Sequence, residues 1–300
     1  MQTTSKILMV RPVRFAFNEE TAKNNYFQQK TEQEKVAEKA LNEFDAFVNL
    51  LRSNDVDVIV IQDTEEPWTP DSIFPNNWFS SHISGELVLY PMFAENRRQE
   101  RKPDVLDFLR RKMNHSKLID LTSWESKNEF LEGTGSMIFD REKRITYACR
   151  SPRTSEKVIR DFCSQMNFDA VVFDSFDKNG NLIYHTNVMM EVGTQVAIVC
   201  LESIRDEKEK QKVVSKLTET GKIIVDISID QVASFAGNMI ELKSRNGNPL
   251  MIMSASARRA LTPQQEATIA TYNKILSPEL QTIETNGGGS ARCMIAEIFY

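Results

Sequence analysis

The chain has 300 residues, of which 41% are apolar and 26% are charged, and its formal net charge is −5. This composition is typical of a globular protein, and the negative charge argues against a nucleic-acid partner, because nucleic-acid binders are usually basic. No apolar run approaches the roughly 18 residues that a helix needs to cross a bilayer, and the first residues lack the pattern of a signal peptide, so we expect no membrane partner.

Four segments, taken in chain order, repeat one pattern: a short apolar strand, a polar turn, a second apolar strand, and a charged stretch with helical spacing. Their first strands are predicted to begin at residues 77, 136, 187 and 238. The turns, such as Ser84-Gly85 in the first segment and residues 246–248 in the fourth, are typical of β-hairpins. The pattern therefore predicts a repeat of hairpins and helices.

Helices are predicted in the charged stretches at residues 155–166, 206–218 and 262–276. The last of these has Thr262 as an N-cap, proline in its first turn and Gln265 three residues after the cap, which is how many helices begin.

A fifth copy of the pattern begins at Cys293 with the sequence CMIAEIFY and contains only one strand. The missing parts lie at the other end of the chain, where residues 6–12 read as an apolar strand and residues 31–51 as a long helix. Both chain ends would then close the fifth unit, and a closed ring, unlike a solenoid, needs no capping repeat. We expect an α/β fold of five ββαβ units around a pseudo-fivefold axis, with residues 1–300 forming a single catalytic domain.

The residues that lead into the five first strands are of special interest, because equivalent positions of a ring of repeats converge near its axis. These positions carry a thiol, an imidazole, a carboxylate and several amides. The residues are Asn77, Glu132, His185, Asn187, Asn238 and Cys293. Their convergence predicts an active site.

Cys293 follows the sequence NGGGSAR, and consecutive glycines let the backbone approach a ligand closely. Cys149, Cys163 and Cys200 lie within or beside strand and helix patterns, where a cysteine is usually a small buried apolar residue. The four cysteines show neither CxxC spacing nor the density of a disulfide framework. We therefore expect Cys293 to be the functional thiol of a cytoplasmic protein.

His185 and Glu132 supply the other groups that thiol chemistry requires. A thiol needs a base to activate it and a leaving amine needs a proton, so cysteine, histidine and carboxylate together meet both demands. The sequence lacks HExxH and any cysteine pair with ligand spacing, and its GGGS run lacks the lysine of a phosphate-binding loop. We expect neither a metal nor another cofactor.

At these residues the sequence resembles the amidinotransferase and deiminase superfamily, whose fold is the five-bladed α/β-propeller called pentein. The resemblance covers nearly the whole chain and includes arginine deiminases, dimethylargininases and citrulline-utilising hydrolases. It is carried by PDSIFPNNWFSSH at 70–82, NRRQER at 96–101, EGTGS at 132–136, SPRTSEK at 151–157, HTN at 185–187 and NGGGSARC at 286–293.

The resemblance implies a role for each matching residue. Cys293 would attack the carbon of a guanidino or ureido group, His185 would protonate the leaving nitrogen, and Glu132 would support the site. Arg98 and Arg153 would hold the α-carboxylate of the substrate, for which a bidentate arginine is well suited.

The sequence departs from the family pattern at Asn77 and Asn187. Enzymes of this superfamily that act on a guanidinium usually place an acidic residue at the first position, and arginine deiminases place one at the second. A buried cation needs a carboxylate, whereas an asparagine amide can both donate to and accept from a neutral ureido group. In the alternative interpretation, the two asparagines only cap strands, and Asp71 or Glu132 binds a cationic substrate.

The residues together with the resemblance predict a hydrolase that cuts the ureido group of citrulline through a covalent thio-intermediate, giving ornithine, carbon dioxide and ammonia. The alternatives are an arginine deiminase or dimethylargininase, an amidinotransferase, and a pentein that binds a partner without catalysis. The expected partner is a small amino acid, and a homo-oligomer is possible.

Overall fold

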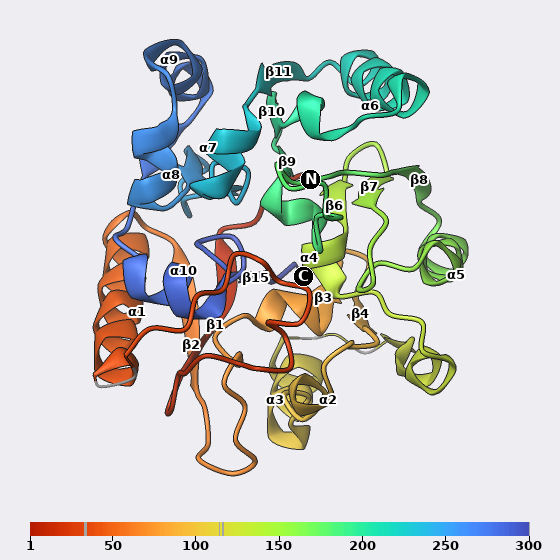
Figure 1. Ribbon diagram of the computed structural model, residues 1–300. Coiled ribbons are helices and arrows are strands. Elements are labelled where there is room, and N and C mark those ends of the chain that lie inside the picture. The colour runs from red at the N-terminus through yellow and green to blue at the C-terminus, as the bar shows by residue number, and fades with distance from the viewer. Residues whose placement is uncertain (33–34, 114, 116, 300) are drawn as a thin grey trace.

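The structure is a computed structural model that describes residues 1–32, 35–113, 115 and 117–299. Five three-stranded sheets stand around a central axis, and the longer helices lie on the outside of the ring (Figure 1). This is the five-bladed α/β-propeller, or pentein, that the repeats predict.

The sheets follow one another along the chain. In order of their middle strands, they consist of β15 (Ala296–Glu297), β1 (Lys6–Arg11) and β2 (Asp57–Gln62); β3 (Phe79–Ser81), β4 (Glu86–Leu89) and β5 (Lys117–Asp120); β6 (Ile138–Asp140), β7 (Ile145–Cys149) and β8 (Asp169–Phe173); β9 (Met190–Val192), β10 (Val196–Val199) and β11 (Ile223–Asp226); and β12 (Ile240–Lys243), β13 (Pro249–Ile252) and β14 (Lys274–Leu276).

Every sheet has the same internal order. The first strand pairs antiparallel with the middle strand, which pairs parallel with the third, as β3, β4 and β5 do. The remaining sheet is built from both ends of the chain, because β15 pairs antiparallel with β1, with Ile7 opposite Glu297, and β1 pairs parallel with β2. The prediction that the two ends close the fifth unit is confirmed.

The helices connect the strands, and the longer ones cover the outer faces of the sheets (Figure 1). The longer ones are α1 (Val36–Ser53), α5 (Glu156–Met166), α6 (Glu207–Glu219) and α9 (Pro263–Tyr272), and the shorter ones are α2 (Glu95–Arg98), α3 (Pro103–Asp107), α4 (Gly133–Ser136), α7 (Ile229–Ala233), α8 (Ala255–Ala260) and α10 (Gln281–Gly287). Short turns of other helical types are η1 (Pro75–Asn77), η2 (Phe108–Lys112), η3 (Thr122–Lys127), η4 (Thr186–Val188) and η5 (Leu201–Ser203).

Apolar side chains spaced three or four residues apart hold these helices on the sheets. In α5, Val158, Ile159, Phe162 and Met166 are buried, which is the apolar stripe of a surface helix. In α9, Thr262 and Gln265 form a reciprocal capping box, as the sequence predicts. No helix in the described part of the chain combines the length and the apolar character that crossing a membrane requires.

Three predicted boundaries differ from the structure. The first strands begin two or three residues later than expected, because the residues before them form short helical turns such as η1 and η4. Residues 274–276, predicted to end a helix, form β14, because the segment Lys-Ile-Leu pairs with the middle strand β13. Helix α1 begins at Val36 rather than at residue 31, and residues 33 and 34 of the predicted helix lie outside the described residues.

Candidate active site

The turns that lead into the first strands bond to one another around the axis. Each turn contacts the turn of the unit before it: Thr134 Oγ1 donates to the Asn76 carbonyl at 3.2 Å, and Thr186 Oγ1 to the Ser136 carbonyl at 2.6 Å. In the next unit, Asn238 Nδ2 donates to the Asn187 carbonyl at 3.0 Å. With the bond from the Arg292 N–H to Asn238 Oδ1 at 3.1 Å, these bonds link the five turns in series, so that side chains far apart in sequence share one site.

Cys293 lies among amides at the end of this ring. Its side chain is buried, with 3% of the residue exposed. Its Sγ receives hydrogen bonds from Asn238 Nδ2 at 3.2 Å and from Asn187 Nδ2 at 3.3 Å. Two N–H donors converge on the one atom that the sequence predicts to be the nucleophile.

His185 and Glu132 form a buried pair, with His185 Nε2 at 2.8 Å from Glu132 Oε2. Burial lowers the pKa of His185 to about 4, although the Glu132 carboxylate acts in the opposite direction. Burial acts to raise the pKa of Glu132, but the charge of Arg153 and the hydrogen bond from His185 outweigh it and hold that pKa well below its usual range. The pair is therefore a neutral imidazole beside a carboxylate, so the histidine has a lone pair with which it can act as a base, although its lowered pKa makes that base weak.

The bond to Glu132 also decides which nitrogen of His185 is the base. A carboxylate only accepts hydrogen bonds, so Nε2 carries the proton and Nδ1 has the free lone pair. Nδ1 lies against Gly135, where a Cβ atom would come within 2.8 Å of it and within 2.3 Å of Asn77 Nδ2. Gly135, the second glycine of EGTGS, is therefore required because a side chain here would clash with both residues. Without one, His185 Nδ1 and Asn77 Nδ2 both lie against the Gly135 backbone.

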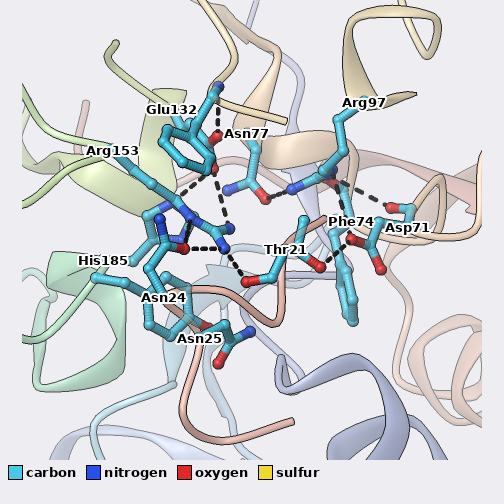
Figure 2. A network of polar contacts seen from close by, with 12 residues as sticks. Thr21, Asn24, Asn25, Asp71, Phe74, Asn77, Arg97, Glu132, Arg153 and His185 are labelled. Carbon is cyan, nitrogen blue, oxygen red and sulfur yellow. Dashed lines mark hydrogen bonds and ion pairs between the residues drawn. The ribbon is translucent and has the colours of Figure 1, made fainter. Parts of the chain in front are cut away.

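Asn77 is held in a single orientation by Arg97. Arg97 Nη1 donates to Asn77 Oδ1 at 2.7 Å, and a guanidinium has no acceptor, so the atom that faces it must be the oxygen. Asn77 Nδ2 is buried and has no partner among the described residues. Figure 2 shows Asn77 between Arg97 on one side and Glu132, Arg153 and His185 on the other.

Arg97 occupies the place that the sequence assigned to Arg98. Arg97 is buried and bound by both oxygens of Glu100, whereas Arg98 donates to the carbonyls of Met92 and Phe93 and lies outside the pocket. The structure places Arg97 rather than Arg98 in the pocket wall, and the role of Arg98 in holding the substrate α-carboxylate stays a prediction. Adjacent residues of the short helix α2 point about 100° apart, so sequence alone did not separate them.

Asp71 and Arg153, both predicted to bind substrate, line the pocket together with His185 and Cys293. Asp71 Oδ2 accepts from Asn18 Nδ2 and from Thr21 Oγ1, while Oδ1 is buried and has no partner among the described residues. Burial raises the pKa of Asp71, and the nearby Arg97 partly offsets this.

The segment at residues 18–28, which the sequence analysis left without a role, covers the pocket. Arg153 donates to the Thr21 carbonyl at 2.6 Å and to Asn24 Oδ1 (Figure 2), and Asn25 Nδ2 lies 3.3 Å from the Gly288 carbonyl. The only signal in the sequence was a polar run, NEETAKNN, without helical or strand periodicity.

The glycine run before Cys293 is required by close packing. A Cβ on Gly289 would lie 3.0 Å from the Phe74 ring and 3.3 Å from the Cβ of Cys293, and Gly288 has a φ of +61°, which residues with a side chain rarely adopt.

The cavity lined by Cys293 and His185 measures only about 20 Å³, enough for about one water molecule. An amino acid is larger than this space.

The groups at this site suit thiol chemistry on a polar carbon centre: a buried thiol with two amide donors, a neutral histidine, and atoms of Asp71, Asn77 and Asn187 that have no hydrogen-bond partner among the described residues. Unpaired buried polar atoms are costly unless a ligand satisfies them. Among the described residues no cluster of three or more His, Cys, Asp or Glu side chains is arranged to hold a metal ion.

Comparison with known proteins agrees with this arrangement. Residues 11–300 match the model of a protein family described as "N,N dimethylarginine dimethylhydrolase, eukaryotic". No curated protein matches the chain significantly.

Similar solved structures share the fold. The N-terminal domain of ArgZ, an arginine dihydrolase from the ornithine–ammonia cycle in Cyanobacteria, solved as a cysteine-to-serine mutant bound to substrate, is 16% identical over 98% of each chain with a TM-score of 0.75. The full ArgZ chain is 17% identical with a TM-score of 0.76, and the match covers 98% of this chain and 40% of ArgZ. A dimethylarginine dimethylaminohydrolase, solved as an adduct with S-methyl-L-thiocitrulline, is 17% identical over 99% of this chain and 100% of its own, with a TM-score of 0.68.

Proposed function

The chain belongs to the N,N-dimethylarginine dimethylhydrolase family and is a hydrolase of carbon–nitrogen bonds other than peptide bonds, and we propose that it opens the ureido group of citrulline to give ornithine, carbon dioxide and ammonia. Residues 1–300 form the one catalytic domain. A reducing cytoplasm suits it, because all four of its cysteines are free.

The orientation of Asn77 carries this proposal. Because Arg97 takes Asn77 Oδ1, the amide presents its Nδ2 donor, buried and unpaired, beside His185 Nδ1. A donor at this place needs an acceptor on the substrate. The ureido group of citrulline has a carbonyl oxygen, whereas a guanidinium has only N–H donors.

The charges around Asn77 favour the same substrate. The charge of Arg97 is balanced by both oxygens of Glu100, and Asn77 itself offers no carboxylate to bind a buried guanidinium. Asn187 Oδ1, which is also buried and unpaired, supplies an acceptor for the ureido NH₂. The two asparagines thus match a neutral group that both accepts and donates.

The reaction follows from the residues in place. His185 Nδ1 takes the proton of the Cys293 thiol, and Sγ attacks the ureido carbon. The bond from that carbon to Nδ of the substrate breaks, and His185 returns the proton to the departing nitrogen, which leaves as ornithine. His185 then deprotonates a water molecule, which hydrolyses the S-carbamoyl group to carbamic acid and so to carbon dioxide and ammonia.

Arginine is the second candidate, and Asp71 is the observation that favours it. Asp71 lines the pocket with an unpaired carboxylate oxygen, which would bind a guanidinium N–H. ArgZ, a structural neighbour, is named as an arginine dihydrolase, and family members act on dimethylarginine by name. Arginine or dimethylarginine would be cut by the same thiol attack.

Binding measurements with an Asn77→Asp variant separate the two substrates. In a Cys293→Ser background, we expect citrulline to bind more tightly than arginine. Asn77→Asp should then weaken citrulline binding by about tenfold or more, because losing a buried polar contact costs roughly 1–3 kcal/mol. Calorimetric titration of both amino acids gives the two dissociation constants.

Asn179→Asp is the matched control, because this exposed asparagine adds the same charge outside the buried network and should leave both constants unchanged. Tighter binding of arginine than of citrulline before any change at Asn77 would overturn the ureido assignment and favour the guanidino one.

A further inference from the structure

We propose that Asn238 is a catalytic residue, which holds the sulfur of Cys293 as a thiolate by hydrogen-bonding to it. This rests on the proposed role of Cys293 as nucleophile but not on which amino acid is the substrate. Asn238 Nδ2 lies 3.2 Å from Cys293 Sγ, so it touches the reacting atom itself.

The amide of Asn238 has only one possible orientation. Its Oδ1 accepts the backbone N–H of Arg292 at 3.1 Å, and a backbone N–H can only donate, so the nitrogen must face the sulfur. One hydrogen of Nδ2 goes to the Asn187 carbonyl at 3.0 Å and the other to Sγ. The thiol can also donate to Oδ1 at 3.7 Å, since this oxygen has a second lone pair, and once the thiol proton is lost the Nδ2 contact with the sulfur remains.

The site gives the thiolate little other help. His185, the nearby base, is held neutral by burial, and the two arginines of the pocket are engaged, Arg97 with Glu100 and Arg153 with the segment at residues 18–28. Charge-assisted hydrogen bonds from amides are therefore the direct stabilisation of the anion.

Asn187 and Asn238 differ in what else they do. Asn187 Oδ1 is unpaired, so this amide has an atom free for the substrate. Both ends of the Asn238 amide are taken by protein groups and by the sulfur. Besides bracing the Asn187 carbonyl, Asn238 therefore acts on the nucleophile and not on the substrate, and a change there should alter thiol ionisation.

The test is the pH dependence of thiol alkylation without substrate. Iodoacetamide labelling of Cys293, followed by peptide mass spectrometry, gives the pH at which the rate reaches half of its maximum. Asn238→Asp keeps the acceptor for Arg292 but replaces the donor with an anionic oxygen. We expect it to raise this midpoint by about one pH unit or more, since one unit corresponds to a tenfold change in ionisation.

Asn238→Ser removes the amide donor without adding charge, and it should move the midpoint in the same direction by a smaller amount. It decides the question if the aspartate variant does not fold. Ultraviolet absorbance of the thiolate gives the same midpoint independently of reagent access. Asn248→Asp, at an exposed turn, is the charge control and should leave the midpoint unchanged.

A midpoint that stays within a few tenths of a pH unit in both Asn238 variants would overturn the proposal and leave Asn238 as a structural brace. That result is distinct from failure of the proposed function. If Cys293 in the wild type were alkylated no faster than Cys163, the nucleophile itself would be misassigned; if arginine were the substrate, the shift would still appear.

Discussion

Cys293→Ser will abolish turnover while leaving the fold intact. A serine hydroxyl is far less acidic than a thiol, so His185 and the two amide donors cannot present it as an anion near neutral pH. We expect kcat to fall by roughly 10⁴-fold or more, the scale of losing a catalytic nucleophile. The measurement is steady-state turnover, with circular dichroism and thermal unfolding to show that the variant remains folded.

Cys163→Ser is the matched control, because Cys163 lies half-buried on α5, away from the pocket. Burial raises the pKa of Cys163 to about 11, of Cys200 to about 11 and of Cys149 to about 12, so these thiols should react slowly with iodoacetamide. Substantial turnover by Cys293→Ser, or loss of turnover in Cys163→Ser, would remove Cys293 from its role.

The second large effect is expected at His185. His185→Ala removes the group that takes the thiol proton and returns it to the leaving nitrogen, so kcat should fall by roughly 100-fold or more, as for a lost general acid–base. Substrate binding should change much less, because Asn77 and Arg153 remain. Single-turnover kinetics and the dissociation constant of citrulline separate the two effects.

His82→Gln provides the comparison, since His82 is also buried but packs against Phe139, Phe162 and Phe168 on the outer side of the sheets. That variant should lose stability and keep its kcat within a few-fold. A His185→Ala variant with a kcat near that of the wild type would make His185 a structural residue.

Much of the fold was predictable because it repeats. Hairpin turns such as Ser84-Gly85 and the capped helix after Thr262 have strong local signals, and their recurrence at similar intervals indicated a ring. The short strand at residues 274–276 was misassigned, because three residues that follow a helix are too few to show a strand periodicity, and only their pairing with β13 makes them a strand.

The positions that lead into the first strands were predictable for the same reason: symmetry brings equivalent residues together, and Cys293, Asn187 and Asn238 do meet. What the sequence did not contain is side-chain direction. The choice between Arg97 and Arg98 depends on which face of a four-residue helix meets Glu100 and Asn77, and such contacts are long-range.

The role of the segment at residues 18–28 was missed because the segment has no regular secondary structure. It contains no repeat and no periodicity, and it contributes through single polar contacts, such as those of Thr21 and Asn24 with Arg153 and of Asn18 with Asp71. Loops of this kind often carry function on a rigid scaffold, but the contacts themselves appear only in three dimensions.

The most direct test of the account is to incubate the purified protein separately with citrulline, arginine and dimethylarginine and to identify the products. Citrulline labelled at its ureido carbon should yield labelled carbon dioxide, with ornithine and ammonia in equal amounts, and Cys293→Ser should yield none of these. Unchanged citrulline, together with consumption of arginine or dimethylarginine, would contradict the ureido assignment.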